Sequence, residues 1–190
     1  MESNQTDEQL AERIQHGEVQ LFEILVNRYH QRLLRYGTKI LFNRTDLEDI
    51  IQEVFLKAFK NFQSFDPSRK FSAWIYRIAH NELINHGKKL SRQIIDYFDF
   101  DIFLPQISTK DRPESNFDNE QLKQMLEKNL STLEPKYREP LVLYYFEDLD
   151  YKEISDILRI PVNTVGVRIL RAKNMLKKLL LITNVPKHRT

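Results

Sequence analysis

Apolar residues recur at intervals of three and four along most of this chain, which is the spacing of one face of an α-helix. The clearest case begins at Phe71, where four residues share one face of a 3.6-residue wheel: Phe71, Ile75, Ile78 and Ala79. Polar and aromatic side chains form a neighbouring stripe on the same segment: Trp74, Arg77, Asn81, Asn85 and Lys88. The segment therefore predicts an amphipathic helix with one unusual flank.

The same periodicity predicts helices along nearly the whole sequence, over residues 7–17, 19–41, 46–62, 69–87, 120–133, 134–148, 150–160 and 164–182. The helix over 46–62 has a broad apolar stripe made of Ile50, Ile51, Val54, Phe55, Ala58, Phe59 and Phe62. Only four of 190 residues are glycine, and Leu, Ile, Lys and Glu are abundant, which favours helix over sheet. Asp150 and Glu153 have the spacing of a capping box, and Asn163 is placed to cap the last helix.

Residues 91–120 interrupt the helical pattern. They contain seven acidic and three basic residues together with Pro105 and Pro113, and show no sustained periodicity. A structureless loop of this length inside one compact domain would be unusual. We therefore expect an all-α protein of two small helical domains, residues 7–90 and 121–182, joined by a flexible acidic linker over 91–120.

Composition excludes several classes of function. The absence of cysteine rules out disulfides and thiolate metal sites, and the five histidines lie at positions that do not pair at i, i+3 or i+4. Neither an HExxH motif nor a glycine-rich phosphate loop is present, so we expect no enzyme, no metal, no cofactor and no small-molecule substrate. The polar, acidic N-terminus lacks a signal-peptide layout and no apolar run approaches membrane-spanning length, so we expect a cytoplasmic protein with no membrane insertion.

The segment 150–182 has the layout of a helix-turn-helix. Two predicted helices are joined by a short turn at Pro161, and residues 163–180 carry five Lys or Arg and no acidic residue. Since the net charge of the chain is only +2, such local clustering is what would attract DNA phosphates. An ordinary helical hairpin with a solvated basic face is the alternative.

Two N-terminal surfaces are also candidates for binding. The flank of helix 69–87 carries aromatic, cationic and amide groups, which suit unpaired bases better than duplex DNA. The simpler interpretation is that Trp74 belongs to the core and the rest of the flank is solvated. The acidic and amide face of helix 46–62 is either solvated or a docking surface for a partner helix.

Taken in order, these features resemble a known family. The segments "DLEDIIQEVFLKAFKNFQSFD", "KFSAWIYRIAHNELINH" and "YKEISDILRIPVNTVGVRILRAK" are similar to the extracytoplasmic-function (ECF) group of the sigma-70 family of RNA polymerase sigma factors, which keeps only regions 2 and 4. The resemblance runs from about residue 8 to 181. It implies a sigma factor without enzymatic activity that binds core RNA polymerase, directs promoter-specific initiation, reads the −10 and −35 elements and aids strand opening.

The resemblance also implies a role for particular residues. The face that would dock on the β′ coiled coil of core polymerase comprises Asp46, Asp49, Gln52 and Glu53. The loop around 61–74 would hold a flipped base, and the set that would read the −10 strand comprises Phe65, Lys70, Trp74, Tyr76, Arg77, Asn81, Asn85 and Lys88. The set that would contact the −35 duplex comprises Asn163, Thr164, Arg168, Arg171 and Lys173.

Further partners follow from the same resemblance. The flank of region 4 would meet the β-flap of core polymerase, and the acidic linker would thread its basic channel. An anti-sigma factor would block the polymerase-binding faces from outside the chain.

Four residues depart from the family pattern. Gly166 and Val167 replace a polar pair in the recognition helix, Pro140 lies inside a predicted helix where it favours a kink, and Arg159 stands where the turn usually has glycine. The main alternative is a conventional regulator that binds duplex DNA through its helix-turn-helix. Segment 46–89 discriminates between the two, because such a regulator has no need of an acidic helix followed by an aromatic and amide-bearing one.

Overall fold

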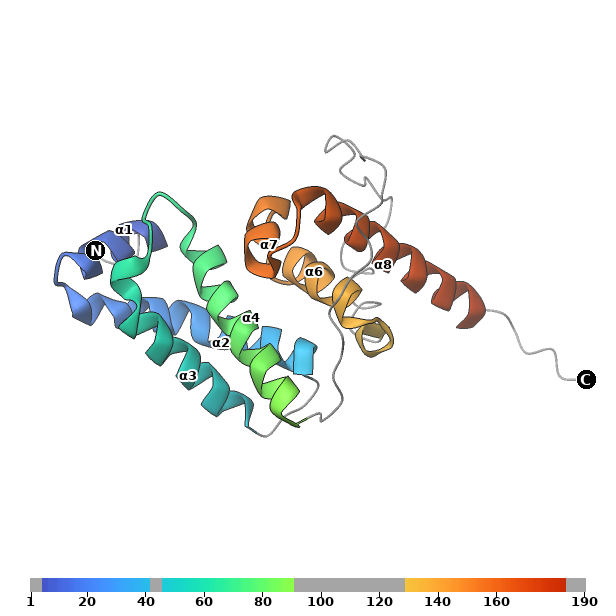
Figure 1. Ribbon diagram of the computed structural model, residues 1–190, viewed down its shortest axis with the longest axis horizontal. Coiled ribbons are helices and arrows are strands. Elements are labelled where there is room, and N and C mark those ends of the chain that lie inside the picture. Colours follow the sequence, from blue (N-terminus) through green and yellow to red (C-terminus); the bar gives the residue numbers. More distant parts are fainter. Residues whose placement is uncertain (1–4, 42–45, 91–128, 184–190) are drawn as a thin grey trace, which may run out of the picture.

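The structure is a computed structural model that describes residues 5–41, 46–90 and 129–183, with side chains described up to residues 87 and 177 in the last two ranges. Figure 1 shows helices joined by turns, and the described residues contain no strand. None of the described helices combines the length and the apolarity needed to cross a membrane.

The N-terminal half is a bundle whose four helices are α1 (Asp7–Gln15), α2 (Phe22–Leu41), α3 (Leu47–Lys60) and α4 (Phe71–Leu90). Single 3-10 turns lie at Val19–Leu21 and Phe62–Ser64. Helices α2, α3 and α4 pack side by side and bury Leu33, Ile51 and Leu83 completely. Burying a side chain of this size contributes about 1.5–3 kcal/mol, so each of these three residues stabilises the contact between the helices.

The C-terminal half comprises a 3-10 turn at Leu130–Thr132 and the helices α6 (Pro135–Tyr145), α7 (Tyr151–Leu158) and α8 (Val162–Thr183). The capping box predicted at the start of α7 is confirmed: Asp150 Oδ1 accepts from the Glu153 amide at 2.8 Å, and Glu153 Oε2 accepts from the Asp150 amide at 2.8 Å. Helices α7 and α8 pack together through a three-residue turn, which is the predicted helix-turn-helix.

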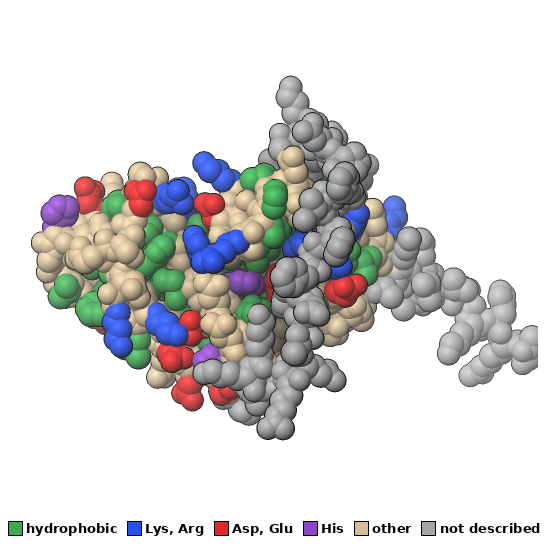
Figure 2. All heavy atoms as spheres, viewed as in Figure 1, with side chains coloured by type: hydrophobic (Ala, Val, Ile, Leu, Met, Phe, Trp, Pro, Cys, Tyr) green, Lys and Arg blue, Asp and Glu red, His purple; other side chains and the backbone are tan. Residues whose placement is uncertain are grey.

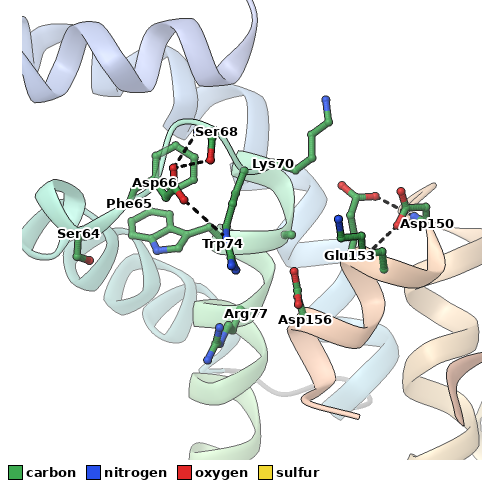
Figure 3. Close-up of a pocket in the computed structure, with 13 residues that line it drawn as sticks. Ser64, Phe65, Asp66, Ser68, Lys70, Trp74, Arg77, Asp150, Glu153 and Asp156 are labelled. Carbon is green, nitrogen blue, oxygen red and sulfur yellow. Dashed lines mark hydrogen bonds and ion pairs between the residues drawn. The ribbon is translucent and has the colours of Figure 1, made fainter. Parts of the chain in front are cut away.

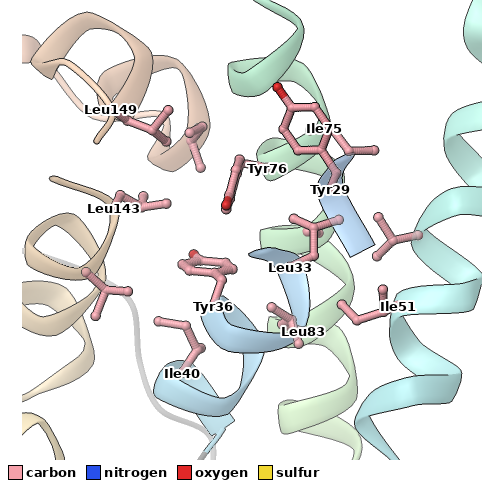
Figure 4. Packing of buried hydrophobic residues seen from close by; sticks show 14 of the residues in the cluster. Tyr29, Leu33, Tyr36, Ile40, Ile51, Ile75, Tyr76, Leu83, Leu143 and Leu149 are labelled. Atoms are coloured by element: carbon pink, nitrogen blue, oxygen red, sulfur yellow. The ribbon is translucent and has the colours of Figure 1, made fainter. Parts of the chain in front are cut away.

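The two halves pack directly against each other. In Figure 1, α7 lies beside α4, and α6 contacts α2. Figure 4 shows Leu143 and Leu149 of the C-terminal half facing Tyr36 and Tyr76 of the N-terminal half across this contact. The buried Arg138 of α6 donates from Nη2 to the carbonyl oxygen of Ile40 at 3.1 Å, at the C-terminal end of α2.

Most of the sequence-predicted helices are confirmed, with small changes at their ends. Helix α4 continues past Gly87 to Leu90, and α8 begins at Val162, so Asn163 lies inside its first turn and does not cap it. Phe59 was expected in the core but is 47% exposed. The acidic linker and most of the helix expected at 120–133 lie outside the described residues.

The structure shows the local conformation or packing at three of the four departures from the family pattern, Arg159, Gly166 and Pro140. Arg159 ends α7 in the left-handed conformation at φ 54°, where glycine would be free of strain. Gly166 packs against the ring of Tyr151, and a Cβ atom there would lie 3.3 Å from Tyr151 Cε2. Helix α6 runs without a break through Pro140, which lies buried near its middle.

Candidate nucleic-acid interface

A cleft of about 690 Å³ lies between the loop before α4 and the start of α7. One wall comes from residues 64–77 and carries the cations Arg69, Lys70 and Arg77, together with Asp66. The opposite wall comes from α7 and its cap, and Figure 3 shows its three carboxylates: Asp150, Glu153 and Asp156. Lys152 is the only cation that the α7 wall contributes. The cleft therefore has a basic wall in the N-terminal half and an acidic wall in the C-terminal half.

Trp74 is part of an aromatic cluster at the base of the basic wall. Its ring lies 5.8, 5.3 and 5.6 Å from the rings of Phe62, Phe65 and Phe71, measured between centroids. Such tilted and edge-on contacts are favourable by about 0.5–1.5 kcal/mol each beyond simple burial. The indole remains partly exposed and lines the cleft, so Trp74 supports the core with part of its surface and offers the rest to a ligand.

The loop that carries the basic wall has a defined shape. Asp66 Oδ1 accepts hydrogen bonds from the Ser68 amide at 3.0 Å and from the Ser68 hydroxyl at 2.7 Å. These bonds lower the pKa of the Asp66 carboxyl, so it is ionised at neutral pH. Gln15 fixes the start of the loop by donating from Nε2 to the carbonyl oxygens of Phe62 and Phe65 at 3.0 and 2.7 Å.

The residues predicted to read an unpaired strand divide into three groups in the structure. Lys70, Asn81 and Asn85 are exposed, and Trp74 and Arg77 are partly exposed, so these five are accessible to a ligand. Phe65 and Tyr76 are buried at 3% and 0% exposure and are covered in this arrangement. The side chain of Lys88 lies outside the described residues. Arg69, which the sequence prediction omitted, is exposed in the same loop, and only its position beside Lys70 could have indicated it.

Tyr76 is buried by both halves of the protein: its ring lies 5.4 Å from that of Tyr36 and 6.4 Å from that of Tyr29 between centroids, and its hydroxyl faces the C-terminal half. Its hydroxyl donates to Glu147 Oε2, and Glu147 is itself only 3% exposed. Arg32 of α2 completes the group: its Nε lies 3.8 Å from Glu147 Oε2, and its Nη2 donates to the Glu147 carbonyl oxygen at 3.2 Å. Burial and then the Glu147 carboxylate raise the pKa of Tyr76 above its ordinary value, and burial also raises the pKa of Glu147.

A second polar pair, between the buried Tyr36 and the half-buried His80, lies further along α4. The hydroxyl oxygen of Tyr36 lies 3.0 Å from His80 Nδ1. Burial lowers the pKa of His80 to about 4, so the imidazole is neutral at physiological pH. His80 therefore acts as a neutral hydrogen-bonding partner for Tyr36.

The predicted duplex-binding residues lie on α8, but they do not all face the same way. Asn163 is exposed, and Thr164, Arg168 and Arg171 are partly exposed. Lys173 faces α6: its Nζ lies 6.0 Å from the centre of the Tyr145 ring and has no hydrogen-bond partner among the described residues. Desolvation lowers the pKa of Lys173 accordingly. The structure thus places Lys173 against the domain core, apart from the other predicted contacts.

Helix α3 presents the predicted polymerase-binding face. Asp49 and Gln52 are exposed, and Asp46 is at the N-terminus of the helix without a side-chain capping bond. Glu53 pairs with His86 of α4, with Oε2 and Nε2 3.0 Å apart. The sequence prediction missed two apolar side chains on this helix, Leu56 and Phe59, which are 59% and 47% exposed. Phe59 fitted the apolar stripe of this helix, so the pattern alone could not reveal its exposure, whereas Leu56 lies outside that stripe and its position could have indicated it.

Within residues 5–41, 46–87 and 129–177, one group of side chains could hold a metal ion. The ligand atoms of Glu53, Glu82 and His86 all lie within 4.8 Å of one another. The Nζ of Lys57 already bonds to Glu82, which is nearly buried, so a divalent cation would have to displace this ammonium group. Together with Lys57, these three residues form an ion-pair network between α3 and α4.

Charges of both signs are interspersed over the molecule. Figure 2 shows basic and acidic side chains side by side on the visible face, with hydrophobic atoms between them. This distribution agrees with a net charge of +2 for the whole chain. Attraction to nucleic acid must therefore be local, as it is on the basic wall of the cleft.

Comparison with known proteins accounts for both halves. Residues 25–93 match sigma-70 region 2, and residues 123–176 match sigma-70 region 4. The ECF RNA polymerase sigma-E factor of Haemophilus influenzae is 31% identical over 179 residues, which cover 90% of this chain and 94% of that protein. The ECF RNA polymerase sigma factor SigW of Bacillus subtilis is 32% identical over 171 residues, which cover 87% and 91%.

The fold has a similar counterpart among solved structures. The structure of CnrH in complex with the cytosolic domain of CnrY has a TM-score of 0.67 at 24% identity and covers 92% of this chain and 96% of that chain. Two helical domains of this kind, with matches to regions 2 and 4, define a transcription initiation factor. More narrowly, the chain belongs to the ECF group of the sigma-70 family, as the resemblance of its motifs predicted. Its function is to bind core RNA polymerase and direct promoter-specific initiation, and the family consists of factors that are not enzymes.

Proposed function

We propose that the basic wall of the cleft and the adjoining flank of α4 read the unpaired non-template strand of the −10 element. The observation that carries this proposal is the exposure of Lys70, Asn81 and Asn85 together with the partly exposed ring of Trp74, which shares one face of α4 with the two asparagines. Cations suit the phosphates of the strand, amides suit base edges, and an aromatic ring offers a stacking surface. An extruded base costs a few kcal/mol of unstacking, which such a surface offsets.

Asn81→Ala tests this proposal. We expect open-complex formation on a promoter mapped by transcript sequencing after controlled overexpression to fall about tenfold, because one base contact is lost. Affinity for core polymerase should stay unchanged. Permanganate reactivity of the promoter measures opening, and fluorescence titration with core measures binding. Asn27→Ala, which removes an exposed amide from α2, is the matched control. Equal opening by the Asn81 and Asn27 variants would refute the assignment.

Trp74→Ala separates the two roles of that residue. If the exposed part of the indole stacks on a base, promoter opening should fall more than core affinity does. If both fall together, and the protein unfolds at lower denaturant concentration, Trp74 serves the aromatic cluster alone.

We also propose that α3 docks on core polymerase. Asp49 and Gln52 provide exposed polar groups, and the neighbouring Leu56 and Phe59 provide apolar surface of the kind found at the centre of interfaces. Phe59→Ala should weaken core binding, while Val19→Ala, a comparably exposed apolar residue in the turn before α2, should not. The same titration with core polymerase measures both.

For the −35 duplex we propose the N-terminal part of α8, with Asn163, Thr164, Arg168 and Arg171 as the contacts. The helix-turn-helix geometry and the exposure of Asn163 support this assignment. Lys173 does not belong to the proposed set, because its ammonium group lies over the Tyr145 ring. Arg171→Ala should reduce binding to −35 duplex DNA and lower its salt dependence, as expected for a phosphate contact.

We further infer that the chain has no enzymatic activity of its own and acts in the cytoplasm, where DNA and RNA polymerase lie. An anti-sigma factor that covers the polymerase-binding faces is the expected regulator. The domain boundaries proposed from the sequence, residues 7–90 and 121–182, suit these two binding roles.

A further inference from the structure

The basic wall of the cleft carries two cations that the fold does not pair. Lys70 is exposed and Arg77 is partly exposed, and within the described ranges neither side chain makes an ion pair. Their neighbour Arg69 already has a partner, since its Nε lies 3.8 Å from Asp66 Oδ2. Lys70 and Arg77 are therefore both available to an anion from outside the chain.

The acidic wall offers one carboxylate that the fold does not use. Asp150 and Glu153 each accept from the other's backbone amide, and Glu153 Oε1 also accepts from the Ser72 hydroxyl at 2.9 Å. Asp156 lines the same wall one turn further along α7 and is exposed. Its carboxylate has neither an ion pair nor a hydrogen bond in the part of the chain that the structure describes. Asp156 can therefore accept hydrogen bonds from a ligand.

An aromatic surface lies between these charged groups. In Figure 3, Trp74 lies between Lys70 and Arg77, and Asp156 approaches the cleft from the opposite side. The indole is fixed by the aromatic cluster behind it and stays partly exposed. Because the ring is already held in place, a flat group can stack on it at a small cost in entropy.

The two cations, the indole and the single carboxylate together narrow the chemistry of the ligand. A polyamine would be repelled by the cations, and an amino acid offers only one negative charge to the two of them. A nucleotide has phosphates for the cations and a flat base for the indole. Guanine adds neighbouring N–H donors at N1 and N2, which suit the two oxygens of a carboxylate. Adenine presents only one amine on that edge, next to an acceptor nitrogen that a carboxylate repels.

The size of the cleft agrees with such a ligand. Its volume is about 690 Å³, within the range of roughly 300–1,000 Å³ that is usual for small-molecule sites. Its position, between two packed domains, is also one where such sites occur often.

We propose that the cleft binds a guanine nucleotide, with its phosphates on Lys70 and Arg77, its base against Trp74, and its N1 and N2 donors on Asp156. This inference goes beyond the reading of the −10 strand, because it requires Asp156 of α7, which the proposed strand-binding surface does not include.

Trp74 is itself the probe for the test, because it is the only tryptophan of the chain. Titration of the full-length protein with GDP should quench Trp74 fluorescence saturably, as stacking on a base does. ADP should bind at least about tenfold more weakly, because it lacks the paired donors for Asp156. Free tryptophan titrated with the same nucleotides corrects for light that they absorb. Thermal unfolding gives a second measure, since a ligand of the folded protein raises the unfolding midpoint.

Two substitutions assign the contacts. Asp156→Asn should abolish the preference for GDP over ADP, and Arg77→Gln should weaken the binding of both nucleotides about tenfold. The matched controls are Glu23→Gln and Lys60→Gln, which remove exposed charges of the same two signs from α2 and α3. Both controls should leave the affinity for GDP unchanged.

Each outcome decides for or against the proposal. Quenching that saturates, favours GDP over ADP and depends on positions 77 and 156 but not on 23 and 60 supports it. Absence of saturable quenching and of thermal stabilisation at millimolar GDP would overturn it, and so would equal affinities of the original protein for GDP and ADP. Neither result bears on the strand-reading role of α4, which fails only if the Asn81 and Asn27 variants open the promoter equally.

Discussion

Protonation of His80 should destabilise the N-terminal half as the pH falls. Burial lowers the pKa of His80 to about 4 in the folded protein, against an ordinary value of 6.5. Between pH 4 and pH 6.5, the His80 imidazole therefore binds a proton in the unfolded chain but not in the folded protein. The contribution of the neutral imidazole to stability is complete above pH 6.5 and is lost progressively as the pH falls toward 4.

The size of the effect follows from the two pKa values. Between pH 7.5 and pH 5.0, the unequal protonation of His80 should lower the free energy of unfolding by about 2 kcal/mol. Urea denaturation followed by Trp74 fluorescence measures it, because the only tryptophan of the chain lies in the same helix as His80. Burial raises the pKa of Glu147, and this shift acts in the opposite direction to that of His80.

A matched variant isolates the histidine. His80→Gln keeps a neutral polar group beside the Tyr36 hydroxyl and removes the titration, so its loss of stability over the same pH range should be smaller by about 2 kcal/mol. His16→Gln, which replaces an exposed histidine, should behave like the original protein. If His80→Gln and the original protein show the same pH dependence, or if NMR finds the pKa of His80 near 6.5, the burial argument is wrong.

Three further predictions concern the helix-turn-helix and are read from thermal or urea unfolding. Gly166→Ala should change stability little, because the gain in helix propensity, about 1 kcal/mol, is offset by crowding of the new methyl group against the Tyr151 ring. In a Tyr151→Ala background, the same substitution should raise stability by about 1 kcal/mol. Equal effects in both backgrounds would show that Tyr151 does not crowd position 166. Arg159→Gly should leave stability unchanged or raise it by up to about 1 kcal/mol, whereas a clear loss would show that φ 54° is not strained. Asp150→Ala should cost about 1 kcal/mol through loss of the capping box, while Asp156→Ala on the same helix should not.

The sequence predicts much of the local structure because local structure depends on near neighbours. The period of the apolar residues marked the helices, and the spacing of Asp150 and Glu153 marked the capping box that the structure contains. The turn of the helix-turn-helix was equally visible at Pro161. Each of these features is set by residues within a few positions of one another.

What the pattern could not predict depends on residues distant in sequence. The hydroxyl of the buried Tyr76 bonds to Glu147, which lies 71 positions away, and no local signal records that pairing. Lys173 belongs to a basic helix whose pattern suits DNA, yet its direction is decided by the Tyr145 ring of another helix. Phe59 fitted the apolar stripe of its helix, but the bundle leaves it at the edge of the core.

The bond from Arg138 to the Ile40 carbonyl oxygen has an evolutionary consequence. The last carbonyl groups of a helix have no partner within it, and here one at the end of α2 is satisfied by a residue 98 positions away. A substitution at position 138 therefore alters how α2 ends, although the two residues belong to regions that could otherwise diverge independently. Every residue at position 40 supplies this carbonyl, so position 138 is constrained by the backbone of α2, whereas Tyr76 and Glu147 bond through their side chains and should change together among relatives that keep this packing. Exchanging region 4 between such relatives should then work best when the residues facing it in region 2 are exchanged as well.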